Sequence, residues 1–435
     1  MKLLVKNGRV VCPGSGRDAP QDVLIEGGKI QKVQPRIRPA GARVIDAAGL
    51  VVAPGFIDMH VHLREPGQED KETIETGGRA AARGGFTTIC CMPNTVPAND
   101  NVVLTRFIRD KARRASVNVL PIAAVTRGLE GRQLTDMADL FKAGAVAFSD
   151  DGRPVWNAQI MRRALESARL LPALVINHCE DPSLSQEGLM HEGARSALLG
   201  LRGIPAAAEE VMVARDIILS EMAGARLHIA HLSTKGAVRL LREAKKRRLP
   251  VTAEVTPHHL CLSDQAVVAT DANFKVNPPL RGREDVAALL TAVQEGLIDV
   301  FATDHAPHTA QEKGKGFEKA PFGINGLETA VSLLLDRLVN KKILSLKQFV
   351  RMMSTTPAIL LGLKDKGVLR PGADADLTLL DLEAGVVVDV EAFASKSRNS
   401  PFHGWRLTGA PAAAIVGGRV AYPFNGRFPG SEAQA

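Results

Sequence analysis

The chain has 435 residues, of which 45% are hydrophobic and 23% are charged, and its formal net charge is +8. This length exceeds one ordinary hydrophobic core, unless the core is a large α/β barrel with a further unit attached. No run approaches the roughly 20 apolar residues of a membrane-spanning helix. The basic residues lie mainly in helix-like segments, and aromatic residues make up only 4%. We therefore expect neither a membrane nor a nucleic acid as a partner.

The N-terminal segment MKLLVKNGRVVCPG and the cysteines indicate a compartment. The apolar runs of this segment are short and are broken by Lys6, Asn7 and Arg9, so we expect no signal peptide. The five cysteines are scattered and include no C-x-x-C pair, which is typical of a reducing environment and not of a disulfide framework. The predicted location is the cytoplasm.

Both ends of the chain predict short β-strands joined by tight turns. Residues 1–52 contain alternating runs with Asn-Gly and Gly-Gly pairs, and residues 366–424 contain the similar runs DLTLLDL and AAAIVGGRVAYPF. Because chain termini often lie close together, we expect both ends to form one small β-sandwich domain beside a barrel of residues 53–365. The polar segment 425–435 is predicted to be a loose tail.

Between the two ends, eight short apolar runs alternate with helix-like segments. Segments such as QIMRRALESARL have apolar residues near the 3.6-residue period. Eight strands alternating with helices over about 250 residues predict a parallel (β/α)8 barrel of the TIM type. A doubly wound sheet is the alternative, but no G-x-G-x-x-G turn follows an early strand. The predicted strands are GFIDMHVH, GFTTICC, VNVLPIAAV, AGAVAFSD, ALVINHC, RLHIAHL, PVTAEVTPH and VFATDHAPH.

Histidine and aspartate residues recur where the predicted strands end. FIDMHVHLREPG places Asp58, His60, His62 and Arg64 at alternate positions, which face one side of a strand. Unpaired polar groups are costly to bury, so this side must meet a metal, a ligand or water. Later strands end near Asp151, His178, His231 and Asp304. Imidazole and carboxylate groups are typical zinc ligands, and six donors are enough for two ions. Asp58 lies one layer deeper and is predicted to have a supporting role.

Two stretches, DMHVHLREPG and ATDHAPHTAQEK, resemble the signature sequences of dihydroorotases, within the metal-dependent amidohydrolase superfamily. MPNT, FSDDG, NHCED, AHLST, KVNPPLR and RPGADADL agree with that family, so the resemblance covers nearly the whole chain. It is strongest to the longer, bacterial-type branch. The resemblance implies a zinc-dependent hydrolase of cyclic amides that interconverts N-carbamoyl-L-aspartate and L-dihydroorotate in pyrimidine (UMP) biosynthesis.

The resemblance also implies roles for individual residues. The implied metal ligands are His60, His62, Asp151, His178 and His231. Asp304 is implied to be the catalytic acid and base and also to touch the metal. The substrate carboxylate would be held by Arg64, Asn94, Asn277 and His308. The ring pocket would be lined by Phe322 and Gly323. Residues 309–321 have the glycine- and lysine-rich composition of a mobile loop, which in this family can close over the substrate.

The end of the fourth predicted strand separates two branches of such enzymes. Many relatives, including hydantoinases and allantoinases, carry a carboxylated lysine there that bridges two metal ions, whereas this chain reads AVAFSDDG. Asp151 can supply the bridging carboxylate instead. This favours a dihydroorotase and leaves open whether the site holds one or two zinc ions.

Two alternatives stay open. One is a hydantoinase- or allantoinase-like amidase. The other is a silent homologue that serves as a structural partner of aspartate transcarbamoylase, although this chain retains every implied ligand. Active family members can also assemble with aspartate transcarbamoylase. A complex with that enzyme and a homo-oligomer are therefore the expected assemblies.

Overall fold

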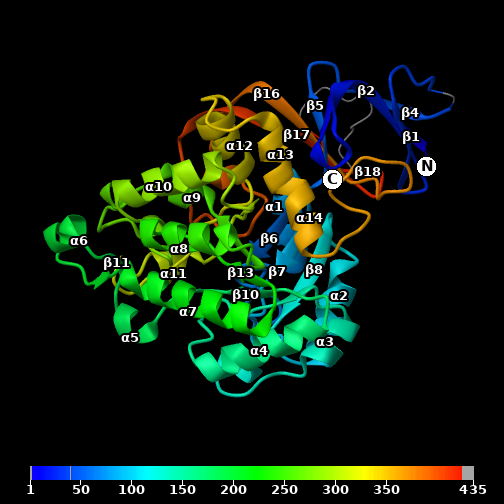
Figure 1. Ribbon diagram of the computed structural model, residues 1–435. Coiled ribbons are helices and arrows are strands. Elements are labelled where there is room, and N and C mark those ends of the chain that lie inside the picture. The colour runs from blue at the N-terminus through cyan, green and yellow to red at the C-terminus, as the bar shows by residue number, and fades with distance from the viewer. Residues whose placement is uncertain (1, 40, 424–435) are drawn as a thin grey trace.

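The strands of the middle and of the two chain ends form separate eight-stranded sheets in the computed structural model, which describes residues 2–39 and 41–423 (Figure 1). The middle sheet is parallel, and its neighbouring strands follow chain order. Its strands are β6 (Phe56–Val61), β7 (Phe86–Cys91), β8 (Asn118–Ala123), β9 (Ala147–Phe148), β10 (Val175–Asn177), β13 (Leu227–Ile229), β14 (Val251–Val255) and β15 (Val300–Phe301). All eight predicted strands are present.

The first and last strands of this sheet meet just beyond their ends. Val61 and His305 form a parallel bridge, and the N–H of His62 donates to the carbonyl of His305 over 2.8 Å. The sheet is therefore a nearly closed barrel, which confirms the predicted TIM-type fold.

Helices surround the barrel because their apolar sides pack on its strands (Figure 1). Ile108 of α2, for example, belongs to the same buried cluster as Ile89 and Cys91 of β7. Several helices begin at a polar residue whose side chain accepts a backbone N–H of the first turn, such as Thr73 and Thr234. The principal helices are α1 (Ile74–Arg83), α2 (Val102–Ala112), α3 (Met137–Ala143), α4 (Ala158–Leu170), α7 (Ala207–Ala223), α8 (Lys235–Lys246) and α10 (Arg283–Gln294).

Shorter elements complete the loops and the last part of the barrel. The short helices are α5 (Pro182–Ser185), α6 (Ala194–Leu199), α9 (Pro257–Cys261), α11 (Ala310–Lys313), α12 (Ala330–Leu334), α13 (Leu346–Val350) and α14 (Thr356–Leu360). Two π-helical segments, Leu335–Val339 and Arg351–Thr355, continue α12 and α13. A two-stranded sheet is formed by β11 (Met190–His191) and β12 (Gly203–Ile204). In the part of the chain that the structure describes, no helix is long and apolar enough to cross a membrane.

The second sheet combines the two ends of the chain, as predicted. Its order is β18-β17-β16-β5-β1-β2-β3, with β4 paired to β1. The junction is β5, which pairs in parallel with β1 and antiparallel with β16. Val23, Ile30, Leu379 and Ile415, from both ends of the chain, share one buried cluster. The strands are β1 (Lys2–Cys12), β2 (Arg17–Glu26), β3 (Lys29–Gln34), β4 (Arg43–Asp46), β5 (Val51–Pro54), β16 (Leu377–Val387), β17 (Arg406–Val416) and β18 (Arg419–Pro423).

This composite β domain contacts the barrel where the barrel strands begin. The N–H of Phe56 donates to Thr378 Oγ1 over 3.0 Å, and Asn118 Nδ2 donates to Asp376 Oδ2 over 2.9 Å. These two contacts lie away from the ends of the barrel strands, where the polar residues gather. The connection between β16 and β17, by contrast, reaches that rim, where Asn399 Nδ2 donates to the carbonyl of Ala306 over 3.0 Å. The boundaries of the two domains stay a prediction, and the predicted tail 425–435 lies outside the described residues.

Candidate metal centre and active-site pocket

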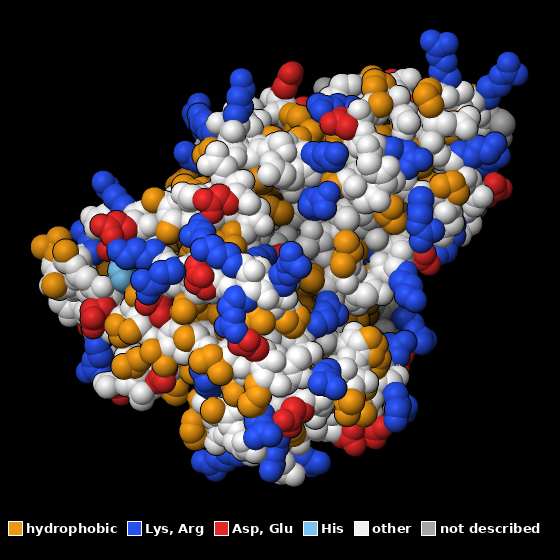
Figure 2. Space-filling view, in the orientation of Figure 1, with side chains coloured by type: hydrophobic (Ala, Val, Ile, Leu, Met, Phe, Trp, Pro, Cys, Tyr) orange, Lys and Arg blue, Asp and Glu red, His pale blue; other side chains and the backbone are white. Residues whose placement is uncertain are grey.

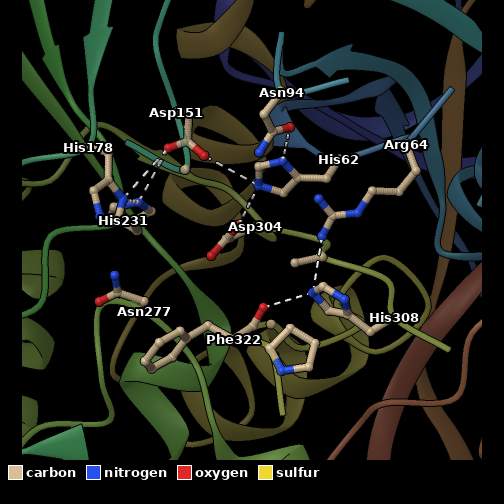
Figure 3. Close-up of a pocket in the computed structure, with 14 residues that line it drawn as sticks. His62, Arg64, Asn94, Asp151, His178, His231, Asn277, Asp304, His308 and Phe322 are labelled. Atoms are coloured by element: carbon tan, nitrogen blue, oxygen red, sulfur yellow. Dashed lines mark hydrogen bonds and ion pairs between the residues drawn. The ribbon is translucent and has the colours of Figure 1, made fainter. Parts of the chain in front are cut away.

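Four imidazoles and two carboxylates meet where the barrel strands end, and Figure 3 shows most of this group. His60 lies in β6, and the other five residues follow the last residue of a strand by one to three positions. Because the strands are parallel, their carboxyl ends share one edge of the barrel. All six side chains are buried. The structure thus brings together His60, His62, Asp151, His178, His231 and Asp304, as the sequence predicted.

Asp151 lies between two pairs of histidines. Its Oδ2 is 3.3 Å from His60 Nε2 and 3.4 Å from His62 Nε2. Its Oδ1 is 3.6 Å from His231 Nε2 and 3.8 Å from His178 Nδ1. Ligand atoms at about 2.0–2.1 Å from a tetrahedral zinc ion lie about 3.3 Å from one another. The spacing of these atoms is therefore that of a metal-ligand shell.

Buried atoms without partners also point to a metal. His60 Nε2 and Asp151 Oδ1 are buried and have no hydrogen-bond partner within residues 2–39 and 41–423, whereas buried polar atoms normally have one. Two groups that share Asp151 each hold three ligand atoms within 4.8 Å of one another: His60 and His62 complete one group, and His178 and His231 complete the other. This donor set fits a metal ion.

The charges of the centre keep its carboxylates ionised. Burial by itself would raise the pKa of Asp304, but His60 and His62 hold it below its ordinary value. Burial would also raise the pKa of Asp151, but His60 and His231 hold that pKa well below its ordinary value. Since metal ligands must be deprotonated, both carboxylates are already in the form that binds a cation.

A cavity of about 310 Å³ adjoins these groups. Its wall includes five of the six candidate ligands, and only His60 lies behind it. The cavity is also lined by all six residues that the resemblance assigned to the substrate: Arg64, Asn94, Asn277, His308, Phe322 and Gly323.

Arg64 reaches the cavity from a loop. Strand β6 ends at Val61, and Arg64 has a φ of +62°, so the strand does not extend to Arg64 as the alternating pattern suggested. Its guanidinium donates to the carbonyl of Pro307 over 3.2 Å and lies 3.3 Å from His308 Nε2. Among the described residues, no carboxylate forms an ion pair with it. Burial lowers the pKa of Arg64 to about 10, so it remains a cation at neutral pH.

The other predicted substrate residues present polar atoms to the same space (Figure 3). Asn94 Oδ1 is 2.8 Å from His62 Nδ1, so it accepts a hydrogen bond that leaves His62 Nε2 for the centre. Among the described residues, Asn277 Oδ1 is buried without a hydrogen-bond partner. His308 Nε2 is 2.8 Å from the carbonyl oxygen of Phe322. The cavity therefore offers one amide oxygen that lacks a partner in the described part of the chain, together with the guanidinium of Arg64.

Residues 309–321, the predicted mobile loop, pack against the wall of the cavity. Lys313 is buried, and its Nζ donates to the carbonyls of Ala272 and Pro321 over 2.9 Å each. Burial lowers the pKa of Lys313 to about 7. Glu312 forms an ion pair of 2.9 Å with Lys71. These contacts describe one position of the loop, and its mobility stays a prediction.

Two glutamates behind the imidazoles are absent from the sequence-based set. Glu254 Oε1 lies 2.5 Å from His60 Nδ1, and Glu180 Oε2 lies 3.5 Å from His178 Nε2. The signal for Glu254 was a lone carboxylate in the apolar strand PVTAEV, and Glu180 follows His178 by two positions in NHCED. Asp58, predicted to have a supporting role, accepts hydrogen bonds from the backbone N–H groups of Thr303 and His60.

A nearly closed (β/α)8 barrel with a histidine–aspartate cluster at its strand ends defines a metal-dependent hydrolase of the amidohydrolase type. Residues 49–237 match the family described as dihydro-orotase-like, and residues 220–422 match the amidohydrolase family. A dihydroorotase from Pelotomaculum thermopropionicum is 56% identical over 97% of this chain and 98% of the relative. A dihydroorotase from Syntrophus aciditrophicus is 51% identical over 97% of this chain and 99% of the relative. The chain belongs to the dihydroorotase family.

Solved structures of hydantoinase-type enzymes share the fold. An L-hydantoinase from Arthrobacter aurescens superposes with a TM-score of 0.88 at 28% identity, covering 97% of this chain and 96% of that one. A dihydropyrimidinase from Brevibacillus agri superposes with a TM-score of 0.86 at 26% identity, covering 98% of this chain and 97% of that one. These identities are about half of those to the dihydroorotases, so the hydantoinase alternative is not favoured.

Proposed function

We propose that this chain is a zinc-dependent dihydroorotase that interconverts N-carbamoyl-L-aspartate and L-dihydroorotate in pyrimidine (UMP) biosynthesis. The observation that carries the choice of substrate is Arg64, a buried guanidinium that lines the cavity beside the candidate metal centre and has no carboxylate partner among the residues that the structure describes. A buried charge is costly unless it is paired, so this cation calls for an anionic ligand. L-Dihydroorotate carries a carboxylate on its ring, whereas hydantoin and dihydrouracil carry none.

The donor set supports zinc at one or two positions. Imidazole nitrogens and carboxylate oxygens are the usual ligands of catalytic zinc. Asp151 presents one oxygen to His60 and His62 and the other to His178 and His231, which supports a bridging role between two ions. When bound, zinc would lower the pKa of a water molecule to about 7 and polarise an amide carbonyl.

Asp304 would move the proton. It lines the cavity, its Oδ1 is 3.0 Å from His62 Nε2, and its pKa is held below the ordinary value, so it can accept a proton from water. In ring opening it would pass this proton to the ring nitrogen as the C–N bond of the cyclic amide breaks. In ring closure it would remove a proton from the carbamoyl nitrogen.

The remaining wall residues would hold the substrate in place. Arg64 has a planar fork that suits a bidentate carboxylate. Asn94, Asn277 and His308 lie beside it in the cavity and would complete the carboxylate site. Phe322 and Gly323 would contact the ring.

The cellular setting follows from the sequence pattern and the family. A cytoplasmic location is supported by the scattered cysteines. Assembly into a homo-oligomer, and with aspartate transcarbamoylase, rests on the resemblance to the family.

The test is ring opening of L-dihydroorotate by purified, zinc-loaded protein, measured beside hydantoin, dihydrouracil and allantoin. Preferential turnover of L-dihydroorotate is the expected result. Preference for a ring without a carboxylate would instead support the hydantoinase-type alternative. Zinc binding without turnover of any substrate, with or without added aspartate transcarbamoylase, would support the silent homologue.

A further inference from the structure

The carboxylate of Glu254 is fully buried and is surrounded by histidines. It lies in β14, and its Oε1 is 2.5 Å from His60 Nδ1. Its Oε2 is 3.2 Å from the Nε2 of His228, which is also buried and whose Nδ1 is 2.8 Å from Thr252 Oγ1. In the part of the chain that the structure describes, its ion-pair partners are these two histidines, with no lysine or arginine among them. An arrangement this costly to bury needs a reason beyond packing.

The same carboxylate oxygen also contacts the backbone of a second candidate ligand. The N–H of His231 donates to Glu254 Oε1 over 3.2 Å. His231 has a φ of +28°, in the left-handed region that residues with side chains rarely adopt. One oxygen atom therefore supports the ring of His60 and the backbone of His231. These two residues belong to different halves of the metal centre.

The hydrogen bond to Glu254 decides which nitrogen of His60 is free. An ionised carboxylate can only accept, so Nδ1 of His60 must carry the hydrogen. In the neutral ring, which is the form that binds a metal, Nε2 then holds a lone pair. This atom lies 3.3 Å from Asp151 Oδ2 and has no hydrogen-bond partner among the described residues. A lone pair that faces a carboxylate is repelled unless a proton or a metal ion lies between them.

The other three imidazoles lack such support. Nδ1 of His62 meets the neutral amide of Asn94, and Nε2 of His178 lies 3.5 Å from Glu180. Nδ1 of His231 has no hydrogen-bond partner among the described residues. Among the described residues, His60 is therefore the one ring of the four that is held at hydrogen-bond distance by a carboxylate outside the candidate ligand set.

We propose that Glu254 is a positioning residue, which holds His60 with its hydrogen on Nδ1 and thereby raises the zinc affinity of the centre. Loss of a carboxylate behind a metal-binding histidine typically weakens metal binding by about 10- to 100-fold. The role rests on the metal site proposed above, but it concerns how that site is built and not which substrate it takes.

The experiment measures zinc affinity directly. Zinc-free full-length protein is titrated with Zn²⁺ in competition with a chromophoric chelator, and its melting temperature is recorded without metal. Glu254→Gln keeps the shape and one acceptor but removes the charge, so we expect about 10-fold weaker zinc binding. Glu254→Leu removes the hydrogen-bond acceptor as well, so we expect zinc binding that is weaker by up to about 100-fold.

The matched control is Glu328→Gln. The Glu328 side chain is 3% exposed, forms an ion pair with Arg83 and accepts the backbone N–H groups of Ala394 and Ser395. It is therefore a glutamate with a largely buried side chain that supports no candidate ligand. Its substitution should leave the zinc affinity unchanged, even if the melting temperature falls.

Three outcomes decide between the explanations. Weaker zinc binding in the Glu254 variants alone supports the positioning role, and Glu254→Gln decides the matter if Glu254→Leu does not fold. Zinc affinity within about twofold of the wild type, with a lower melting temperature, would show a merely structural role and overturn the proposal. Failure of the wild type itself to bind zinc would overturn the proposed metal site together with it.

Discussion

The rim of the barrel and the composite β domain both bury side chains, but the β domain buries mainly apolar atoms and the rim buries polar and charged ones. In the β domain, Val23, Leu379 and Ile415 pack in one apolar cluster. At the rim, by contrast, polar atoms such as His60 Nε2 are buried without hydrogen-bond partners, and the cation of Arg64 has no counter-ion, within the part of the chain that the structure describes. Apolar burial stabilises a fold, whereas unsatisfied polar burial destabilises it. The β domain is therefore built for stability, and the rim is built for ligands that complete it.

The surfaces of the two regions are consistent with this division. The space-filling view in Figure 2 shows lysine and arginine side chains spread over both the barrel and the β domain, in agreement with the net charge of +8. The charge that matters for the proposed function is instead the buried guanidinium of Arg64, which lines the cavity at the rim of the barrel. Four test substitutions separate stability from activity, and these four follow from the largest expected effect to the smallest. Two of them are accompanied by a comparison variant.

Asp304→Asn should give the largest effect, at the rim. The amide has the same shape but cannot accept the proton, so we expect kcat for L-dihydroorotate to fall by about 10²- to 10⁴-fold. The melting temperature without metal should stay close to that of the wild type. Steady-state kinetics and a thermal melt check both statements. Near-normal kcat would remove Asp304 from the role of acid and base.

Leu379→Ala, in the β domain, should lower the stability of the protein and leave kcat unchanged. Leu379 is fully buried in β16, and truncation of such a leucine costs about 2–5 kcal/mol in the free energy of unfolding. Because the strands around Leu379 contact the barrel where the barrel strands begin, kcat should be unchanged at temperatures where the variant is folded. Urea denaturation measures the loss of stability.

Val387→Ala is the control on the same strand. Val387 is 60% exposed, so its truncation should change the free energy of unfolding by no more than about 0.5 kcal/mol. A fall in kcat for folded Leu379→Ala would contradict the separation of the two regions.

Arg64→Met should weaken the binding of carboxylate substrates. Hydrogen bonds to a charged group contribute about 1.5–3 kcal/mol, so KM for L-dihydroorotate should rise by about 10- to 100-fold. Any turnover of dihydrouracil, which has no carboxylate, should be unaffected. Since the variant removes a buried cation without a counter-ion, the melting temperature should not fall. Arg64→Lys keeps the charge but lacks the planar fork, so its KM for L-dihydroorotate should lie between those of the wild type and Arg64→Met. An unchanged KM would place the carboxylate elsewhere.

Asp374→Asn, in the β domain, should give the smallest effect of the four test substitutions. Burial by itself would raise the pKa of Asp374, but Lys29 at 2.7 Å and Lys366 at 3.0 Å lower it below its ordinary value of 3.8. A lowered pKa contributes stability above the unfolded-state value, and this stability is lost as the pH falls through the folded-state value.

The variant should therefore be less stable at neutral pH by up to about 1 kcal/mol, because the pair is partly exposed. The difference should vanish below the pKa of the folded state. Urea denaturation at neutral and acidic pH measures it. A difference that persists in acid would mean that packing, and not charge, explains the effect.

The amino-acid sequence by itself determined the strand order of the barrel and the residue types at its rim. Strand and helix periods are local, so they could be recognised in segments such as GFIDMHVH and QIMRRALESARL. Parallel strands end at one edge, so His178 and His231 could be placed together although 53 residues separate them. The combination of both chain ends into one β domain also followed from local strand signals.

Only the tertiary structure decided how the polar atoms of the rim are paired. Glu254 and His60 are 194 positions apart, and their contact depends on the curvature of the closed barrel, which no local pattern encodes. The loop conformation of Arg64 and its lack of a counter-ion likewise arise from the neighbours that the fold supplies. Sequence periodicity sets the direction of a side chain, whereas its partners, and hence its charge state and its role, depend on distances that exist only in the folded chain.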